Sequence, residues 1–123
     1  ALKCAAPGVP DFYQGTEFWD LSLVDPDNRH PVDYARRRQA LDAMTDSIAA
    51  SGLTTTAAAL LEARVDGRVK LFTLHRCLQA RHRLPGVFAD GTYEPLPTSG
   101  PGAESLFAFV RRHGDALVLV CVP

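Results

Sequence analysis

One segment near the start of the chain reads PGVPDFYQGTEFWD over residues 7–20, and residues 25–34 then read DPDNRHPVDY. Prolines and glycines recur too often in these segments for a long helix to form. The segments are also too aromatic for a solvated linker, so we expect them to pack or to bind something. Loops that carry function have this character.

The two segments hold the side-chain types that a sugar site needs. Sugar rings present hydroxyls at their rims and C–H groups on their faces, so carboxylates, amides and arginines serve as hydrogen-bond partners and aromatic rings as platforms. Residues of these types are Tyr13, Gln14, Glu17, Trp19, Asp20, Asp25, Asn28 and Arg29. A structural interpretation is equally good on composition alone, because Tyr and Trp also fill cores, and Asp and Asn also cap turns.

The same residues resemble a known enzyme superfamily. GVPDFYQGTE at 8–17 resembles the G-x-P-x-x-Y-x-G-x-E segment at the eighth barrel strand of the alpha-amylase superfamily, and residues 25–33 are similar to its DPDNRRPVD stretch. His30 stands where arginine is the commoner residue. The combination of PGVPDFYQGTE at 7–17, WDLSLVDPDNR at 19–29 and PVDYARR at 31–37 resembles the malto-oligosyltrehalose synthases more than other members. DGRVKL at 66–71 and LPGVF at 84–88 also resemble their C-terminal part.

This resemblance implies the C-terminal part of an isomerase of trehalose biosynthesis. Such an enzyme is an intramolecular transglycosylase that converts the reducing-end α-1,4 bond of a malto-oligosaccharide into an α,α-1,1 bond. The superfamily uses a retaining mechanism with three carboxylates, which come from the fourth, fifth and seventh barrel strands. The released glucose, instead of water, then attacks the glycosyl-enzyme intermediate.

The chain matches only the eighth strand onward, so the resemblance implies that it holds no catalytic residue and is inactive alone. We also expect no cofactor and no metal, because the chain has neither metal-ligand spacings nor phosphate-loop motifs. In the full enzyme, seven residues are expected to face the malto-oligosaccharide or to shape the loop: Tyr13, Gln14, Glu17, Trp19, Asp25, Asn28 and Arg29.

Helical patterns follow this region. Asp33 predicts the cap of a helix that ends at Ser51-Gly52. A short helix capped by Thr54 or Thr55 is expected to run to about Arg64. Another helix should follow Asp66-Gly67 and stop at Pro85-Gly86. The apolar stripe of the first helix is predicted to be Tyr34, Leu41, Met44 and Ile48, and that of the third Val69, Phe72, Leu74, Leu78 and Leu84.

After Pro85 the composition favours strands. We expect strands over 92–96, where a proline suits an edge position, and over 106–112 and 116–122, with a hairpin turn at 113–115. The predicted fold class is therefore α+β. Residues 1–85 would be the end of an alpha-amylase-type (β/α)₈ barrel, comprising its last strand, loop and helices. Residues 86–123 would begin a C-terminal β domain as a small antiparallel hairpin or sheet.

Three consecutive arginines, Arg36, Arg37 and Arg38, lie between the apolar positions of the first helix. They suit either an anion or glycan contact or, more commonly, a solvated helix face.

Length and composition exclude several classes of protein. The 123 residues are too few for a complete barrel, which needs about 250. Hydrophobic residues make up 46% and charged residues 22%, so the chain should fold. The net charge of -1 argues against a nucleic-acid partner. No apolar run approaches the roughly 20 residues of a membrane span, and the first residues do not form a signal peptide.

The cysteines and histidines indicate no metal site. Cys4, Cys77 and Cys121 form no CxxC pair, and we expect them to be buried thiols in a reducing cytoplasm. His30, His75, His82 and His113 lack zinc-ligand spacing. Phosphate-loop motifs and the GxSxG nucleophile motif do not occur.

Two alternatives stay open at this stage. One is another alpha-amylase-superfamily hydrolase acting on α-glucans, and the other is a non-catalytic α+β interaction module. The chain has no initial Met, so we expect it to be part of a longer protein. Apolar surface left without its neighbours also leaves self-association open.

Overall fold

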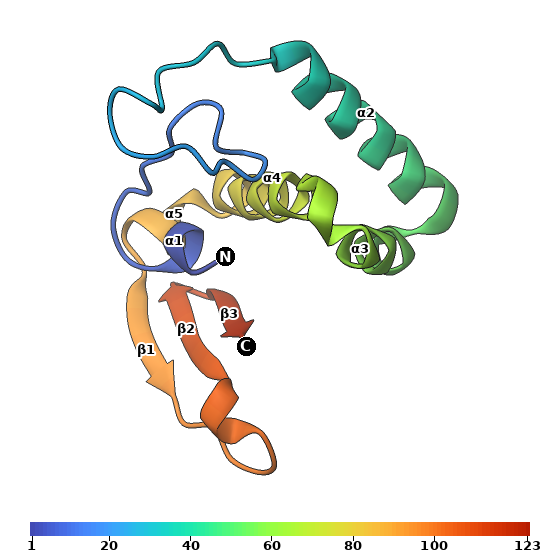
Figure 1. The fold of residues 1–123 in the computed structure, drawn as a ribbon. Coiled ribbons are helices and arrows are strands. Elements are labelled where there is room, and N and C mark those ends of the chain that lie inside the picture. Colours follow the sequence, from blue (N-terminus) through green and yellow to red (C-terminus); the bar gives the residue numbers. More distant parts are fainter. The chain divides into compact units, whose positions relative to one another are not determined.

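A computed structural model describes all residues, 1–123. A long loop follows the first short helix, four helices and a 3₁₀ turn then run to Ala89, and three strands follow (Figure 1). The helices are α1 (Leu2–Ala5), α2 (Tyr34–Ser51), α3 (Leu53–Glu62), the 3₁₀ turn η1 (Arg64–Asp66), α4 (Arg68–Arg83) and α5 (Pro85–Ala89). The strands are β1 (Thr92–Leu96), β2 (Phe107–His113) and β3 (Ala116–Val122), with the 3₁₀ turn η2 (Ala103–Ser105) before β2.

The start and end of α2 are confirmed. The carboxylate of Asp33 accepts a hydrogen bond of 2.8 Å from the backbone N–H of Arg36, which supplies one of the partners that a helix start lacks. The helix ends at Ser51, and Gly52 follows. Within the predicted stripe, Met44 is buried, but Tyr34 is 57% exposed, so its inclusion was wrong. Tyr34 is the first helical residue and lies six residues before Ala40, the first buried residue of the helix.

The predicted cap of α3 was wrong. The helix begins at Leu53, directly after Gly52, and has no side-chain cap, so Thr54 and Thr55 lie inside its first turn. The important threonine is the next one, the buried Thr56. Its hydroxyl donates to the carbonyl of Gly52 at 2.9 Å and lies 3.0 Å from the Ser47 hydroxyl, which ties α3 to α2.

The break before α4 is confirmed. The carboxylate of Asp66 accepts from the backbone N–H of Arg68 at 2.9 Å. Gly67 has φ +83°, and a Cβ there would lie 3.0 Å from the backbone nitrogen of Trp19, so both conformation and space require glycine. Helix α4 ends at Arg83 as expected, but a further short helix, α5, starts at Pro85. Proline is favoured at a first helical position.

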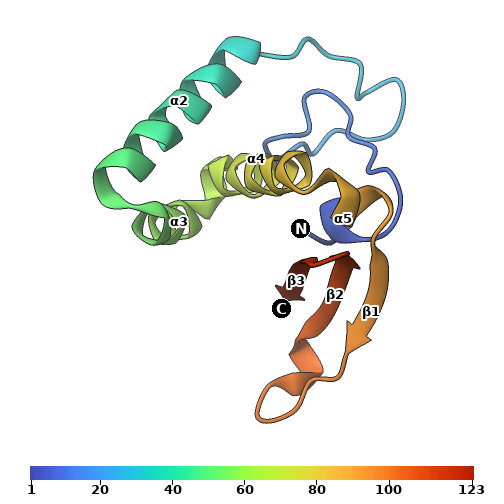
Figure 2. The ribbon, with the colours of Figure 1, turned by 180° about the vertical axis from the view of Figure 1, so that it is seen from behind.

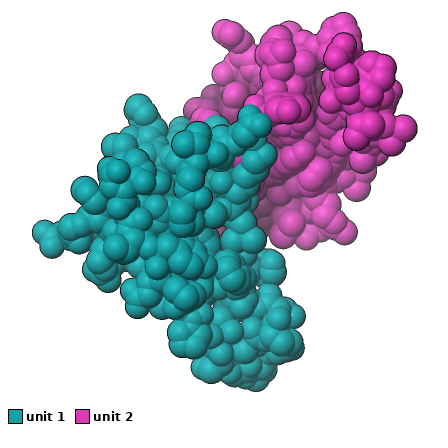
Figure 3. Space-filling model, turned by 90° about the vertical axis from the view of Figure 1, so that its left-hand side faces the viewer, with its two compact units in different colours: residues 1–11, 76–123 teal, residues 12–75 magenta.

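The chain divides into two compact units, residues 12–75 and residues 1–11 with 76–123 (Figure 3). The core of the first unit joins the loop to three helices: Phe18, Ala40, Met44, Leu60 and Leu71. Leu71, absent from the predicted stripe of α4, is the buried residue of that helix. The core of the second unit joins α1 and α5 to the sheet: Ala5, Phe88, Phe109 and Val120.

The sheet of the second unit is antiparallel, with strand order β1-β2-β3 (Figures 1 and 2). Pro95 lies in the edge strand β1, as predicted. His113 pairs with Ala116, so Gly114 and Asp115 form a two-residue turn between β2 and β3, and the predicted hairpin is confirmed.

The side chain of Arg111 in β2 is 1% exposed and has no carboxylate partner. Its guanidinium instead donates to four backbone carbonyls of the same unit. These are the oxygens of Thr92 (3.0 Å), Ala5 (3.1 Å), Phe88 (3.3 Å) and Gly91 (2.9 Å). One buried cation therefore connects α1, α5 and the start of β1 to the central strand.

The cysteines meet expectation in part. All three are free thiols, and Cys4 is buried, but Cys121 is exposed. Cys121 alternates along β3 with the inward-facing Val120 and Val122, so it lies on the outer side of the strand together with the half-exposed Leu117 and Leu119.

Helices followed by a small antiparallel sheet confirm the α+β order. Residues 7–33 contain no helix or strand, and the chain by itself displays no barrel. The domain boundary after residue 85 stays a prediction. None of the helices combines the length and the apolar character that crossing a bilayer requires.

We predict that Arg111→Met lowers the free energy of unfolding by about 3 kcal/mol or more, because several buried carbonyls lose their donor. Chemical denaturation followed by far-UV circular dichroism measures the change. Arg112→Met, at the exposed neighbouring position, is the control and should change stability by less than about 0.5 kcal/mol. Equal losses in the two variants would contradict the role assigned to Arg111.

Candidate functional site

A polar hollow of about 690 Å³ lies in the first compact unit, between the two segments that sequence analysis singled out. Its volume is within the usual range for small-molecule sites. Its lining comprises Phe12, Tyr13, Gln14, Thr16, Asp20, Asn28, Arg29, His30 and Val32.

Four of the seven predicted site residues line this hollow: Tyr13, Gln14, Asn28 and Arg29. The other three, Glu17, Trp19 and Asp25, do not. Sequence analysis missed Phe12, Thr16, His30 and Val32 as lining residues, although all lie in the same two segments. Only their proximity to the predicted residues could have indicated them.

Glu17 shapes the turn that carries Tyr13 and Gln14. Its carboxylate accepts from the backbone N–H of Gly15 at 3.1 Å and from Nε of Arg37 at 2.5 Å. Gly15 has φ +94°, and a Cβ there would lie 3.0 Å from the side chain of Val32. The turn therefore needs glycine at this position.

The pKa of Glu17 reflects this environment. Partial burial acts to raise it, but the hydrogen bond from Arg37, the backbone hydrogen bonds and the charge of Arg37 together lower the pKa below its ordinary value of 4.5. Glu17 is thus an ionised structural carboxylate and does not suit the role of a proton donor.

The polar side chains of the hollow are held by neighbours. The hydroxyl of the exposed Tyr34 donates to the side-chain oxygen of Gln14. Asp20 accepts from the hydroxyl and, at 3.0 Å, from the backbone N–H of Ser22. These hydrogen bonds lower the pKa of Asp20, and the one from the Ser22 hydroxyl has the larger effect. His30 Nε2 lies 3.9 Å from the Asp20 carboxylate.

Asp25 acts through Arg29. Its carboxylate accepts from the Arg29 guanidinium at 2.5 and 2.6 Å, four residues apart in the same loop. The pair is mostly solvent-exposed, with side chains 71% exposed for Arg29 and 55% for Asp25. Asp25 therefore orients the arginine that lines the hollow.

Trp19 packs away from the hollow. Its indole N–H donates to the carbonyl of Arg64 at 2.7 Å, and the Lys70 ammonium lies 5.6 Å from the ring centre. The Lys70 ammonium also donates to the carbonyl of Phe18 at 3.0 Å. In this chain, Trp19 anchors the loop to η1 and α4.

The arginine triple divides into three roles. The Arg36 guanidinium stacks over the ring of Phe18, 4.6 Å from its centre, whereas Arg37 pairs with Glu17. Arg38 is exposed. Arg37 fits neither the predicted anion or glycan contact nor a solvated helix face, because its guanidinium donates to the protein's own backbone carbonyls.

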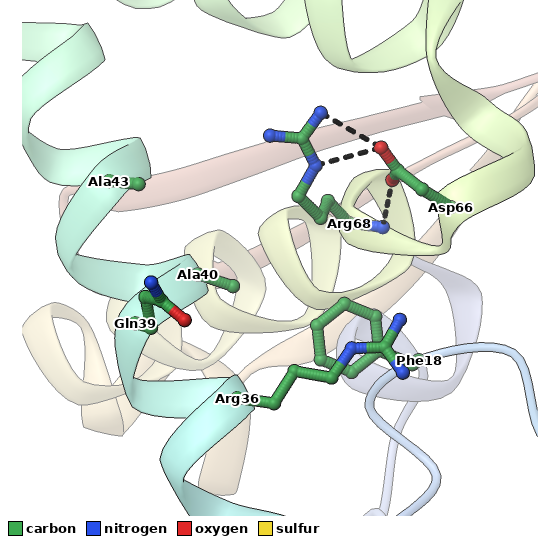
Figure 4. A pocket seen from close by; sticks show the side chains of 7 residues that line it. All are labelled: Phe18, Arg36, Gln39, Ala40, Ala43, Asp66 and Arg68. Atoms are coloured by element: carbon green, nitrogen blue, oxygen red, sulfur yellow. Dashed lines mark hydrogen bonds and ion pairs between the residues drawn. The ribbon is translucent and has the colours of Figure 1, made fainter.

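A second, smaller hollow of about 280 Å³ lies in the same unit (Figure 4). Its lining is Phe18, Arg36, Gln39, Ala40, Ala43, Asp66 and Arg68. In the close view, Arg36 extends over the Phe18 ring, and Arg68 forms an ion pair of 2.8 Å with Asp66 on the opposite side. The hydrogen bonds from the side chain and backbone of Arg68 lower the pKa of Asp66. The charged groups that line this smaller hollow thus already have partners within the protein.

The other unit has an apolar hollow of about 230 Å³, and all three cysteines line it. Burial raises the pKa of Cys4, so this thiol is protonated at neutral pH. No group of three or more His, Cys, Asp or Glu side chains has the geometry of a metal site.

The polar hollow of the first unit has the best arrangement for binding. It offers amides from Gln14 and Asn28, one carboxylate, one guanidinium and the rings of Phe12 and Tyr13. One negative and one positive charge suit an uncharged ligand with many hydroxyls. Aromatic faces beside such donors and acceptors match the two surfaces of a sugar ring.

Comparison with known proteins gives a consistent result. No protein-family model matches the chain. Two curated relatives from Mycobacterium tuberculosis, from strains CDC 1551 and H37Rv, are 41% identical over 97% of this chain and carry the name maltooligosyl trehalose synthase. The chain spans 12% of their length.

Solved structures agree with the sequence relatives. A crystal structure of a maltooligosyl trehalose synthase matches 89% of this chain with a TM-score of 0.69 and 33% identity. The synthase from Arthrobacter ramosus matches 88% with a TM-score of 0.66 and 40% identity. The matches cover 14% and 13% of those chains.

The pKa of Glu17 leads to a prediction about acid stability. Because the pKa is lowered by folding, the unfolded state takes up the proton first, so the stabilisation is present above about pH 4.5 and is lost as pH falls through the folded value. We predict that Glu17→Gln is less stable than wild type at neutral pH but loses less stability on acidification to about pH 3. Urea denaturation at both pH values measures this. The control is Glu62→Gln at the exposed end of α3, which should behave as wild type. If Glu17→Gln and wild type lost the same unfolding free energy on acidification, the prediction would be contradicted.

Proposed function

The chain is a homologue of one segment of the maltooligosyl trehalose synthases, and we propose that it forms part of an intramolecular transglycosylase. The reaction would rearrange the reducing-end α-1,4 bond of a malto-oligosaccharide into an α,α-1,1 bond. The single observation that carries this proposal is the 41% identity over 97% of the chain.

In this proposal, the catalytic carboxylates lie in a part of the protein outside this chain. A retaining mechanism requires a nucleophile and a general acid/base about 5–5.5 Å apart across the scissile bond. The carboxylates around the polar hollow suit other tasks, because Glu17 and Asp25 pair with arginines and Asp20 with Ser22. This chain would bind and orient the malto-oligosaccharide.

Within the hollow, Gln14 and Asn28 would accept and donate hydrogen bonds to glucosyl hydroxyls. The exposed ring of Tyr13 would supply a platform for a sugar face. Arg29, held by Asp25, would donate from the second of the two segments. The hollow's balanced charge supports an uncharged substrate.

For the parent enzyme we propose the arrangement expected from sequence. Residues 1–85 would complete a (β/α)₈ barrel, and residues 86–123 would begin a C-terminal β domain. The helices followed by an antiparallel sheet support this division. A cytoplasmic location, the absence of nucleic-acid and membrane partners, and self-association stay predictions.

The decisive assay uses the full-length protein with maltopentaose. We predict that reducing ends disappear without release of glucose, because the glucose freed in the first step, instead of water, attacks the glycosyl-enzyme intermediate and becomes bonded through its anomeric hydroxyl. The 123-residue chain alone should show no turnover. Release of glucose as the main product would favour an α-glucan hydrolase, and no change in a correctly folded full-length protein would favour a non-catalytic module.

Variants of the hollow test the binding role. Gln14→Ala and Asn28→Ala should each raise the KM for maltopentaose by about tenfold, which corresponds to the loss of one sugar hydrogen bond. Gln39→Ala removes an amide that lines the smaller hollow instead and is the matched control. A KM change in the control equal to that of Gln14→Ala would contradict a specific role of the polar hollow in binding.

A further inference from the structure

The turn that carries Tyr13 and Gln14 is held by one side chain from another element. Arg37, in the first turn of α2, donates from Nε to the Glu17 carboxylate and from Nη2 to the carbonyl of Gly15, each at 2.5 Å. Its remaining nitrogen, Nη1, donates to the carbonyl of Asp33 at 3.0 Å. A single guanidinium thus joins the turn to the start of the helix.

Glu17 completes a closed circuit of hydrogen bonds. Its carboxylate accepts from Arg37 and also from the N–H of Gly15, whose carbonyl accepts from Arg37. The peptide groups on both sides of Gly15 are therefore held by one ion pair. Because Gly15 is buried and has φ +94°, the chain at this point has few other ways to be stabilised.

The pair is sheltered from water. The side chain of Arg37 is 15% exposed and that of Glu17 25% exposed. The buried ring of Phe18 lies 5.4 Å from the Arg37 guanidinium carbon, so the fork rests against the core of the unit. Water screens a sheltered pair less than an exposed one.

Arg37 does not line the polar hollow, and each of its three nitrogens already donates within the protein. It is therefore unsuited to contact a ligand directly. Its effect on a ligand would pass through the turn, since Tyr13 and Gln14 lie immediately before Gly15 and line the hollow.

We propose that Arg37 is a positioning residue: its guanidinium fixes the turn 13–16 against α2 and thereby sets where Tyr13 and Gln14 meet a glucosyl unit. The inference rests on the function proposed above. Lysine cannot replace it, because a single ammonium group cannot reach the three acceptors to which the planar guanidinium donates at once.

The test compares Arg37→Lys with Arg38→Lys in the full-length protein, using maltopentaose. Both variants keep the positive charge on adjacent residues of the same helix, and Arg38 is exposed. Arg37→Lys should raise KM about tenfold, the equivalent of one misplaced hydrogen bond, with kcat changed less than about threefold because uniform binding is lost. Arg38→Lys should leave both unchanged.

A double-mutant cycle separates positioning from a general loss of structure. Glu17→Gln, which keeps a hydrogen-bond acceptor, should raise KM less than Arg37→Lys does. Combining the two should raise KM no further than Arg37→Lys alone, because both act on one turn. Should Arg37→Lys fail to fold, Glu17→Gln carries the test by itself, with faster amide exchange at Gly15 as the accompanying readout.

Three results would overturn the inference. They are equal KM values in the two lysine variants, multiplicative effects in the double mutant, or a KM increase in Glu17→Gln without faster exchange at Gly15. Failure of the proposed function is distinguishable, because the wild-type protein would then show no loss of reducing ends from maltopentaose.

Discussion

Carbonyl groups in loops and near the ends of short helices and strands lack partners within their own element, and in both compact units an arginine side chain supplies the missing donors. Arg111 donates to four carbonyls in the unit that contains the sheet, and Arg37 to two carbonyls and a carboxylate in the unit of the loop. A planar guanidinium offers five N–H donors in a fixed geometry. Arg111 thereby joins two short helices to the start of a strand, and Arg37 joins a loop to the start of a helix.

Sequence reasoning succeeded where the signal is local. Asp33 caps α2, Pro95 lies in an edge strand, and Gly114 turns the hairpin, each for reasons contained within a few residues. It failed where contacts between distant residues decide. The hydroxyl of Thr56 lies against that of Ser47, nine residues away, and the hydroxyl of the exposed Tyr34 donates to Gln14, twenty residues away.

The candidate site shows the same division. Composition and resemblance indicated the two segments that line the polar hollow, but not which of their side chains face it. Glu17 and Trp19 have the chemistry of sugar contacts, yet their polar atoms bind Arg37 and the carbonyl of Arg64. Neither partner could be predicted from the spacing, since they lie 20 and 45 residues away. A carboxylate or an indole is available to a ligand only when the fold has not already used it.

The two ion pairs beside the hollow differ in how strongly dissolved salt screens them. Charges in contact with water are screened over about 8 Å at physiological ionic strength, whereas sheltered charges are screened much less. Asp25 and Arg29 are both more than half exposed, while Glu17 and Arg37 are mostly covered. We therefore expect rising ionic strength to weaken the pair of Asp25 with Arg29 and to change the pair that holds the turn of Tyr13 and Gln14 much less. The position of Arg29 in the hollow therefore depends on salt concentration, whereas the positions of Tyr13 and Gln14 depend on it much less.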